Sequence, residues 1–260
     1  MSTTFFWSLI GLFVGSFLNV VIKRLPIIIG YEVKEKSLSK KKFNLISPRS
    51  FCFFCGKKLS IIENIPILSY LLQSGRCKSC KKKISPSYLC VELISLILSA
   101  ILIWNYGAGF FGVSSLIFVW FTIVLSVIDF QNKILPDELT LLLMWIGIIL
   151  SYFNIFVTLE DSVLGAIVGY LFFWIIFWVY FLISKKEGIG YGDLKFLAAL
   201  GAWFGWKSLP MILITSSVLG LIYGITMIYL YSHRSNKPIP FGPFLGMGGL
   251  LCIILSNKIN

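Results

Sequence analysis

Charged residues are scarce in this sequence, and acidic residues are scarcer than basic ones. Of the 260 residues, 13% are charged and 57% are hydrophobic, and the mean hydropathy is +0.88. Ordinary soluble domains carry about 25% charged residues. The deficit excludes a soluble globular protein and indicates that most of the chain lies in a lipid bilayer.

Alternating polarity is also missing. A transmembrane barrel shows segments of about 10 residues in which polar and apolar side chains alternate, whereas the apolar runs here are long and continuous. Because a backbone in lipid must satisfy its own hydrogen bonds, such runs predict α-helices. Basic residues are lacking before the first run, Phe5 to Val21, and follow it instead as Lys23 and Arg24. A removable signal peptide has the reverse order, so we expect a retained first span.

The apolar runs predict an all-α, polytopic membrane protein with about eight spans, since one crossing needs about 20 apolar residues. The spans are placed near residues 4–22, 90–106, 110–128, 138–157, 162–184, 194–206, 209–231 and 239–256. The run at 194–206 would form a helix of only about 20 Å, against a hydrocarbon core of about 30 Å, so it either is re-entrant or extends at one end. We expect three parts: a first span at 1–22, an insert at 23–89 and a transmembrane core at 90–260.

The net charge of +12 is concentrated in the predicted insert. Fifteen of the 23 lysine and arginine residues lie between Lys23 and Lys83. A cytoplasmic loop that contacts the lipid bilayer explains this distribution better than a nucleic-acid surface does. Alternation of eight spans then leaves only Lys207 and Lys258 on the outer side. We therefore expect a multi-pass membrane protein with the insert in the cytoplasm.

The insert contains two C-x-x-C pairs, Cys52 with Cys55 and Cys77 with Cys80, separated by 21 residues. Two such pairs favour a tetrahedral zinc ion, and nearby lysines help to keep the thiols deprotonated. Two disulfides or a redox pair are the alternatives. A cytoplasmic location disfavours stable disulfides, and no thioredoxin-like pattern surrounds the pairs. Because four protein ligands close the coordination shell, we expect a structural zinc ion that staples a small insert.

Four other residues receive simpler interpretations. Cys90 and Cys252 lie at or in spans and are expected to be buried as small apolar residues. His233 is the only histidine, and with no histidine, cysteine or acid near it in sequence we expect it to be solvated. Glu92, near the start of the second span, is expected to cap that helix or to pair with a basic residue of the insert.

Two of the eleven acids stand at costly positions. Asp129 ends the third span, and Asp193 follows Gly190-Tyr191-Gly192 just before the short run. Ionisable residues at membrane boundaries are expensive and are candidates for function. Asp137 has a simpler explanation, because an acid that follows a proline in the first turn of a helix commonly caps it.

Brought together across helices, Asp129 and Asp193 would form an aspartyl site. Two carboxylates a few ångströms apart share one proton. The ionised one can act as general base on a water, while the protonated one polarises the scissile carbonyl and protonates the leaving amine. Gly190 and Gly192 would let backbone or substrate approach the second acid, and Lys195 would hold substrate, tune the charge of the acid or snorkel to the headgroups. A transporter that relays protons or binds cations would use the same acids.

Several sequence blocks, in this order, resemble the type IV prepilin peptidases, a family of GxGD aspartic proteases. The blocks are Gly15-Ser16-Phe17-Leu18-Asn19-Val20-Val21-Ile22 with Arg24-Leu25-Pro26, Asn64-Ile65-Pro66-Ile67-Leu68-Ser69-Tyr70, Gly75-Arg76-Cys77, Val91-Glu92-Leu93, Asp129 with Leu135-Pro136-Asp137, Gly190-Tyr191-Gly192-Asp193-Leu194-Lys195, and Pro240-Phe241-Gly242-Pro243-Phe244. A GxGD motif alone is weakly specific, whereas the ordered set with a tetracysteine loop is strongly specific. The chain departs from the family at Ser87-Tyr88-Leu89-Cys90, where a Tyr-Pro pair is common.

The resemblance implies that Asp129 and Asp193 are the catalytic pair and that the four insert cysteines bind zinc. It implies a prepilin or pseudopilin precursor of a pilus, type II secretion or competence system as substrate, whose short basic leader is cut off after a glycine. Similar proteins with the tetracysteine loop also methylate the new N-terminal amine with S-adenosylmethionine. The sequence has no glycine-rich pattern for that cofactor, so methyl transfer rests on the resemblance alone. A membrane methyltransferase that has lost its peptidase activity is a further alternative.

Overall fold

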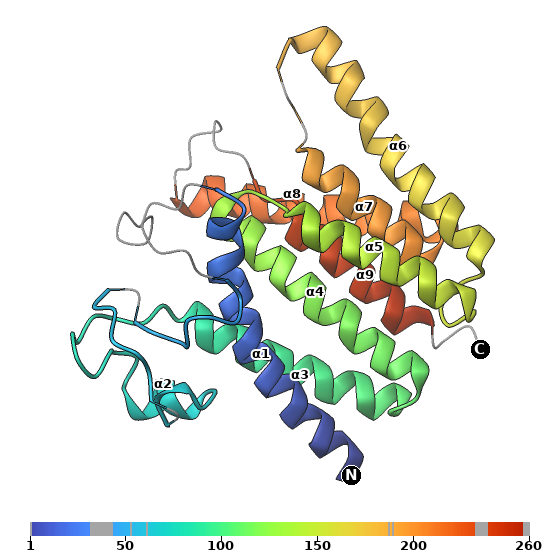
Figure 1. Ribbon diagram of the computed structural model, residues 1–260. Helices are drawn as coiled ribbons and strands as arrows, with labels where there is room; N and C mark the ends of the chain where they lie inside the picture. The colour runs from blue at the N-terminus through green and yellow to red at the C-terminus, as the bar shows by residue number, and fades with distance from the viewer. Residues whose placement is uncertain are drawn as a thin grey trace. The chain divides into compact units, whose positions relative to one another are not determined.

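The computed structural model describes residues 2–31, 44–52, 54–60, 62–186, 188, 190–231 and 239–256 (Figure 1). Within these ranges the secondary structure is helical apart from two isolated bridges, Phe51 to Lys58 and Arg76 to Lys83. The all-α prediction is confirmed. His233 lies outside the described residues, so the expectation for it stays a prediction.

A helix occupies each of the eight predicted spans. These helices are α1 (Ser2–Ile28), α3 (Ser87–Tyr106), α4 (Phe110–Asn132), α5 (Asp137–Tyr152), α6 (Leu159–Ser184), α7 (Tyr191–Phe204), α8 (Leu209–Tyr231) and α9 (Gly242–Ser256). Among the described helices, α1, α3, α4, α6 and α8 are long and apolar enough to cross a membrane. Helices α5, α7 and α9 have 16, 14 and 15 residues. The sequence therefore identified one short helix where the structure has three.

Two helix ends differ from the predicted boundaries. Helix α1 continues beyond residue 22 to Ile28 and contains Pro26 close to its end, where the proline lacks the N–H that would bond to the carbonyl of Ile22. Helix α5 ends at Tyr152 rather than at residue 157. Asn154 ends the helix there, because its φ of 52° is left-handed and its N–H donates to the carbonyl of Ser151. Asparagine tolerates this conformation better than most residues do.

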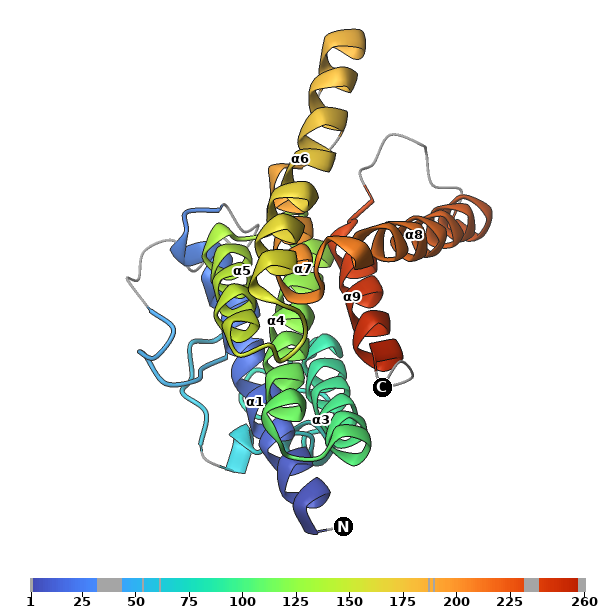
Figure 2. The ribbon, with the colours of Figure 1, turned by 90° about the vertical axis from the view of Figure 1, so that its right-hand side faces the viewer.

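The chain forms two compact units, residues 1–120 and 121–260. In the first unit α1 and α3 lie side by side (Figures 1 and 2). A Cβ atom on Gly11 would lie 2.3 Å from Oγ of Ser99, and one on Gly15 would lie 3.0 Å from Cα of Glu92. Ser95 also donates a hydrogen bond of 2.6 Å from its hydroxyl to the carbonyl of Gly11. Two glycines four residues apart thus let the helix backbones approach closely, as is common in lipid.

The insert of the first unit connects α1 to α3 and contains the 3₁₀ helix η1 (Ile62–Asn64) and the short helix α2 (Leu68–Leu72). Arg24 of α1 is 3% exposed and anchors the beginning of the insert. Its guanidinium donates to the carbonyl of Asn44 over 2.9 Å and to that of Pro48 over 2.8 Å. A small insert with little core of its own is thereby tied to a long helix.

Helix α7 lies at the centre of the second unit, where it packs against α5, α6, α8 and α9 (Figure 1). Its residues from Phe196 to Phe204 are all buried. Gly165 lets the backbones of α6 and α7 approach closely, because a Cβ atom there would lie 2.2 Å from the carbonyl oxygen of Gly201. A helix that is apolar on every side is stable where other helices bury all of its faces. The short predicted span at 194–206 is therefore a core helix of this unit.

Helix α9 packs against α8 and against the end of α4. A Cβ atom on Gly246 would lie 2.4 Å from Cγ2 of Thr122, and one on Gly248 would lie 3.0 Å from the carbonyl oxygen of Ile212. The hydroxyl of Ser216 donates to the carbonyl of Phe244 over 3.0 Å. These contacts fix the start of α9 beside the last turn of α4, where Asp129 lies.

Candidate active site and metal site

Asp129 occupies the last turn of α4 and is 6% exposed. Its Oδ2 atom accepts a hydrogen bond of 2.9 Å from the backbone N–H of Gly242, the first residue of α9. A Cβ atom on Gly242 would lie only 2.8 Å from the same oxygen. The contact thus depends on a residue without a side chain, because any larger residue would push the carboxylate away.

Asp193 lies in the first turn of α7, next to the N-cap residue Gly190. Its N–H donates to the carbonyl of Gly190 over 3.0 Å. The Oδ1 atom is buried and has no hydrogen-bond partner among the described residues. A helix N-terminus stabilises a negative charge, and buried polar atoms in proteins normally have a partner. This oxygen is therefore available to a substrate or a water.

Leu135, in the loop between α4 and α5, links the two acidic motifs. A Cβ atom on Gly192 would lie 2.7 Å from Cβ of Leu135, and one on Gly242 would lie 3.1 Å from its Cδ2. The turn before Asp193 and the start of α9 therefore touch the same leucine. Since Gly242 binds Asp129 and Gly192 precedes Asp193, the surroundings of the two acids meet at Leu135. The structure thus brings together the two acids that the sequence singled out.

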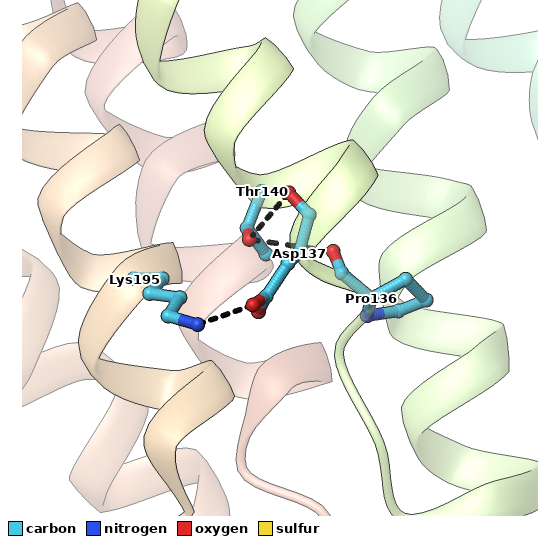
Figure 3. A network of polar contacts seen from close by, with 4 residues as sticks. All are labelled: Pro136, Asp137, Thr140 and Lys195. Carbon is cyan, nitrogen blue, oxygen red and sulfur yellow. Dashed lines mark hydrogen bonds and ion pairs between the residues drawn. The ribbon is translucent and has the colours of Figure 1, made fainter. Parts of the chain in front are cut away.

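Lys195 of α7 forms an ion pair with Oδ2 of Asp137, the first residue of α5 (Figure 3). The N-cap position of α5 is Pro136, and no side chain caps the helix by a hydrogen bond. The expectation that Asp137 caps α5 was wrong, because its carboxylate turns to the lysine instead. Thr140 bonds back within the same turn, to the carbonyls of Pro136 and Asp137. The ion pair between Lys195 and Asp137 links α7, the helix that carries Asp193, to α5.

Gly242 and Leu135 were not identified as site residues from the sequence. Both lie inside blocks that resemble the peptidase family, but a glycine and a leucine carry no chemistry that a motif would reveal. Their roles depend on contacts between segments far apart in the chain. The sequence signal was only that Gly242 is a glycine, a residue that lets another group approach the backbone closely.

The four insert cysteines form a cluster in the first unit. Their sulfur atoms all lie within 4.8 Å of one another, and Sγ of Cys52 lies 3.9 Å from Sγ of Cys80. A tetrahedral zinc ion with Zn–S bonds of about 2.3 Å separates its sulfur ligands by about 3.8 Å. The cluster therefore fits a zinc ion in both ligand type and spacing.

The two cysteine knuckles have the same backbone turn. In the first, the N–H of Gly56 donates to the carbonyl of Cys52 over 2.8 Å, and in the second the N–H of Lys81 donates to that of Cys77 over 2.9 Å. Gly56 and Lys81 have φ values of 70° and 59°. The two isolated bridges occupy equivalent positions around the knuckles. Two copies of one turn thus present four sulfur atoms to one point.

The thiols of this cluster differ in acidity. Backbone N–H groups of Cys80 and Ser79 lower the pKa of Cys77 to about 7. Burial raises the pKa of Cys52 to about 11. A bound dication favours the thiolate form of every ligand, so it would offset the cost of ionising the buried thiol.

Three further expectations are decided by burial and hydrogen bonds. Cys252 is 9% exposed, as predicted, whereas Cys90 is exposed and was predicted wrongly. Glu92 neither caps its own helix nor pairs with a basic residue among those described. Its Oε2 atom accepts the backbone N–H of Ile67 over 2.7 Å, so it holds the insert against α3.

Comparisons with known proteins agree along the whole chain. The description "Bacterial Peptidase A24 N-terminal domain" matches residues 9–106, and "Type IV leader peptidase family" matches residues 116–225. Proteins named "Prepilin leader peptidase/N-methyltransferase" from Aeromonas salmonicida (strain A449) and Pseudomonas aeruginosa are each 41% identical to it, over 97% of this chain and 90% of theirs. One of the same name from Dichelobacter nodosus is 42% identical, over 98% of this chain and 93% of its own. No solved structure gives a significant match.

These similarities cover both units and contain the acidic motifs as well as the cysteine cluster. They decide between the enzyme and the transporter that the two aspartates alone left open. The chain belongs to the type IV leader peptidase family and is an enzyme of the membrane.

Proposed function

We propose that this protein is an aspartic endopeptidase that removes the short leader from type IV prepilin-like precursors, cutting after a glycine, and then methylates the new N-terminal residue. The observation that carries the proposal is that Gly192, beside Asp193, and Gly242, which binds Asp129, both pack against Leu135. The names of the relatives support both activities. Substrates would be membrane-anchored pilin or pseudopilin precursors.

The hydrogen bonds of the two acids suggest a division of roles. The N–H of Gly242 stabilises negative charge on Asp129, because a donor favours the ionised form of a carboxylate. Asp129 would take a proton from a water as it attacks the scissile carbonyl carbon. Asp193 would donate a hydrogen bond to the carbonyl oxygen and then protonate the leaving amine as the C–N bond breaks. Hydrolysis would need no covalent intermediate.

Gly190, Gly192 and Lys195 would support this site without taking part in the chemistry. The glycines keep the turn before Asp193 narrow, since a side chain on Gly192 would strike Leu135. Lys195 holds the first turn of α7 against α5 through Asp137. Lys195 is thus a positioning residue in this proposal, because its side chain is already engaged by an acid outside the catalytic pair.

Zinc and S-adenosylmethionine would be the cofactors of this enzyme. Cys52, Cys55, Cys77 and Cys80 would hold the metal, which stabilises the insert and takes no part in hydrolysis. When bound, S-adenosylmethionine would supply the methyl group for the new N-terminal amine.

The cellular arrangement is part of the proposal. Concentration of basic residues between Lys23 and Lys83 supports a cytoplasmic insert, and the chain would lie in the bacterial inner membrane. We also propose three parts, on the basis of the apolar and basic segments of the sequence: a first span at 1–22, an insert at 23–89 and a peptidase core at 90–260. Both acids would then face the compartment that contains the basic leader.

The test uses the full-length protein in detergent with a purified prepilin. Mass spectrometry of the product reports the cleavage position and N-methylation together. We expect Asp129→Asn and Asp193→Asn each to lower the cleavage rate by about 10²–10⁴-fold, the usual contribution of general acid–base catalysis. Glu138→Gln is the matched control, because this exposed acid lies in the first turn of α5 and should leave the rate unchanged. Full cleavage by either aspartate variant would refute the mechanism.

A further inference from the structure

A groove of about 560 Å³ lies in the first unit, between one face of α1 and the insert, and we call it the α1 groove. Binding sites for small molecules usually have volumes of about 300–1,000 Å³. Neither of the two aspartates of the candidate peptidase site lines the groove, and none of the four insert cysteines does. Neither the peptidase chemistry nor the metal cluster therefore accounts for it.

Helix α1 lines the groove with Phe13, Ser16, Phe17, Val20 and Arg24. Because these positions recur every three or four residues, they share one face of the helix. Phe13 is 62% exposed and Phe17 is 50% exposed, and α1 is long and apolar enough to cross a membrane. Large apolar side chains avoid water, so in the bilayer these two rings need acyl chains beside them.

The insert completes the groove with a loop that contacts within the chain hold in place. Ile46 lines the groove from this loop and is 88% exposed. The N–H groups of Ile46 and Ser47 donate to Oδ1 of Asn44 over 2.9 and 2.6 Å. Arg24 of α1 binds the carbonyls of Asn44 and Pro48. A site that is formed in advance costs less free energy to fill than one that must order itself.

The other end of the groove is positively charged. Arg24 comes 11 residues after Phe13, which corresponds to about 16 Å along a helix. Arg49 belongs to the loop that Arg24 holds, is exposed and also lines the groove. No acidic residue lines the groove, and no acid in the described part of the chain forms an ion pair with Arg49. An anionic group therefore finds a cationic partner at this end.

We propose that the α1 groove binds an anionic phospholipid, with its phosphate at Arg49 and an acyl chain along Phe13 and Phe17. A phospholipid has its charge and its acyl chains at opposite ends, which is the arrangement of the groove. The guanidinium of arginine binds phosphate oxygens in a bidentate manner. Because a ligand that binds only the folded protein stabilises it, the bound lipid holds the insert against α1.

Two other occupants fit the groove less well. The proposed leader of a prepilin precursor is basic, and two arginines without an acid beside them repel a basic peptide. Free phosphate would use Arg49 but would leave Phe13 and Phe17 uncovered. A phospholipid is the occupant that uses both ends of the groove.

The test measures lipid binding by native mass spectrometry of the full-length, zinc-containing protein released from detergent. The probes are phosphatidylglycerol and phosphatidylcholine with the same acyl chains, so that only the charge of the head group differs. We expect phosphatidylglycerol to bind with an apparent Kd at least about 10-fold lower than that of phosphatidylcholine. Equal affinity for the two lipids would refute the inference.

Two variants test the charged end of the groove. Arg49→Gln should raise the Kd for phosphatidylglycerol about 10-fold, because it removes the charge and the bidentate donor. Lys58→Gln is the matched control, since Lys58 is an exposed basic residue of the insert outside the groove lining. It should bind phosphatidylglycerol like the wild-type protein. Wild-type affinity in Arg49→Gln, or an equal loss in both variants, would overturn the assignment.

A second pair of variants tests the apolar end. Phe17→Ala should raise the Kd for phosphatidylglycerol about 3-fold, because part of the ring no longer covers the acyl chain. Phe6→Ala removes a ring from the same helix at a 60% exposed position outside the groove lining and should leave the Kd unchanged. Inorganic phosphate at constant ionic strength should not displace the lipid. Displacement would show that the groove takes free phosphate and would refute the lipid assignment.

A further measurement covers the case in which Arg49→Gln does not fold. Phosphatidylglycerol with a photoreactive group in its acyl chain is crosslinked to the wild-type protein in the presence of excess phosphatidylcholine, and digestion with mass spectrometry locates the label. We expect label on peptides from residues 2–31 and 44–66, which contain the groove lining. Label confined to residues 121–260 would place the lipid on the second unit and refute the inference.

Discussion

The backbone N–H of Gly242 donates a hydrogen bond of 2.9 Å to Oδ2 of Asp129, a residue 113 positions earlier in the chain. This contact joins the first residue of α9 to the last turn of α4. It gives one of the two acids a fixed donor, while Oδ1 of Asp193 has no partner in the described part of the chain. The candidate catalytic pair is thus asymmetric before any substrate arrives.

Replacement of Gly242 by alanine is expected to damage the site more than the fold. The new Cβ atom would lie 2.8 Å from Oδ2 of Asp129 and 3.1 Å from Cδ2 of Leu135, so the carboxylate must move. Disturbing a preorganised donor costs about 10²-fold in rate, and we expect a loss of that order in prepilin cleavage. Gly220→Ala is the control, because the nearest atom there lies at 3.4 Å, an ordinary contact. Equal rates for the two variants would mean that the Asp129 contact is unimportant.

Removal of the insert cysteines should release the metal. We expect about one zinc ion per chain in the wild-type protein by elemental mass spectrometry, and none when the four cysteines of the cluster are changed to serine. A structural zinc site contributes about 10–16 kcal/mol of apparent binding energy, so the insert should become sensitive to limited proteolysis. Cys90→Ser and Cys252→Ser are controls that should keep the metal. Unchanged zinc content without the four cysteines would contradict the assignment.

The ion pair between Lys195 and Asp137 predicts a measurable coupling. The side chains are 25% and 54% exposed, and such partly exposed pairs contribute about 0.2–1 kcal/mol. A double-mutant cycle with Lys195→Met and Asp137→Asn, followed by thermal unfolding in detergent, measures that energy. Each single variant should also lower the cleavage rate, because α7 carries Asp193. A coupling energy near zero would show that the pair does not hold the helix.

The two cysteine knuckles predict that glycine is favoured at two equivalent positions. Lys81 has a left-handed φ of 59° where the first knuckle has Gly56 at 70°. An ordinary residue pays about 1 kcal/mol for this conformation, so Lys81→Gly should strengthen zinc retention against a chelator. Gly56→Ala should weaken it by a similar amount. If both variants retain zinc like the wild type, the turns are not under conformational strain.

Much of the architecture was predictable because lipid imposes simple rules on sequence. Long apolar runs have one way to satisfy their backbone hydrogen bonds, so each predicted span became a helix. Helix ends were less predictable: α5 ends early at a left-handed Asn154, a choice made by local turn geometry. The sequence also predicted only one short helix, whereas the structure has three. A short helix is stabilised when neighbouring helices bury it, and that burial cannot be read from the residues of the helix itself.

The sequence by itself determined the chemistry that the protein can bring to bear: two acids at costly positions and four thiols at zinc-binding spacing. Residue type and local spacing carry that information, because ionisable groups near lipid and paired cysteines have few other uses. Tertiary structure alone decided which groups meet. Packing of α9 against α4 placed the N–H of Gly242 on Asp129, and packing of α7 against α5 turned Asp137 from a helix cap into the partner of Lys195. Such contacts depend on how distant segments approach, which no local pattern records.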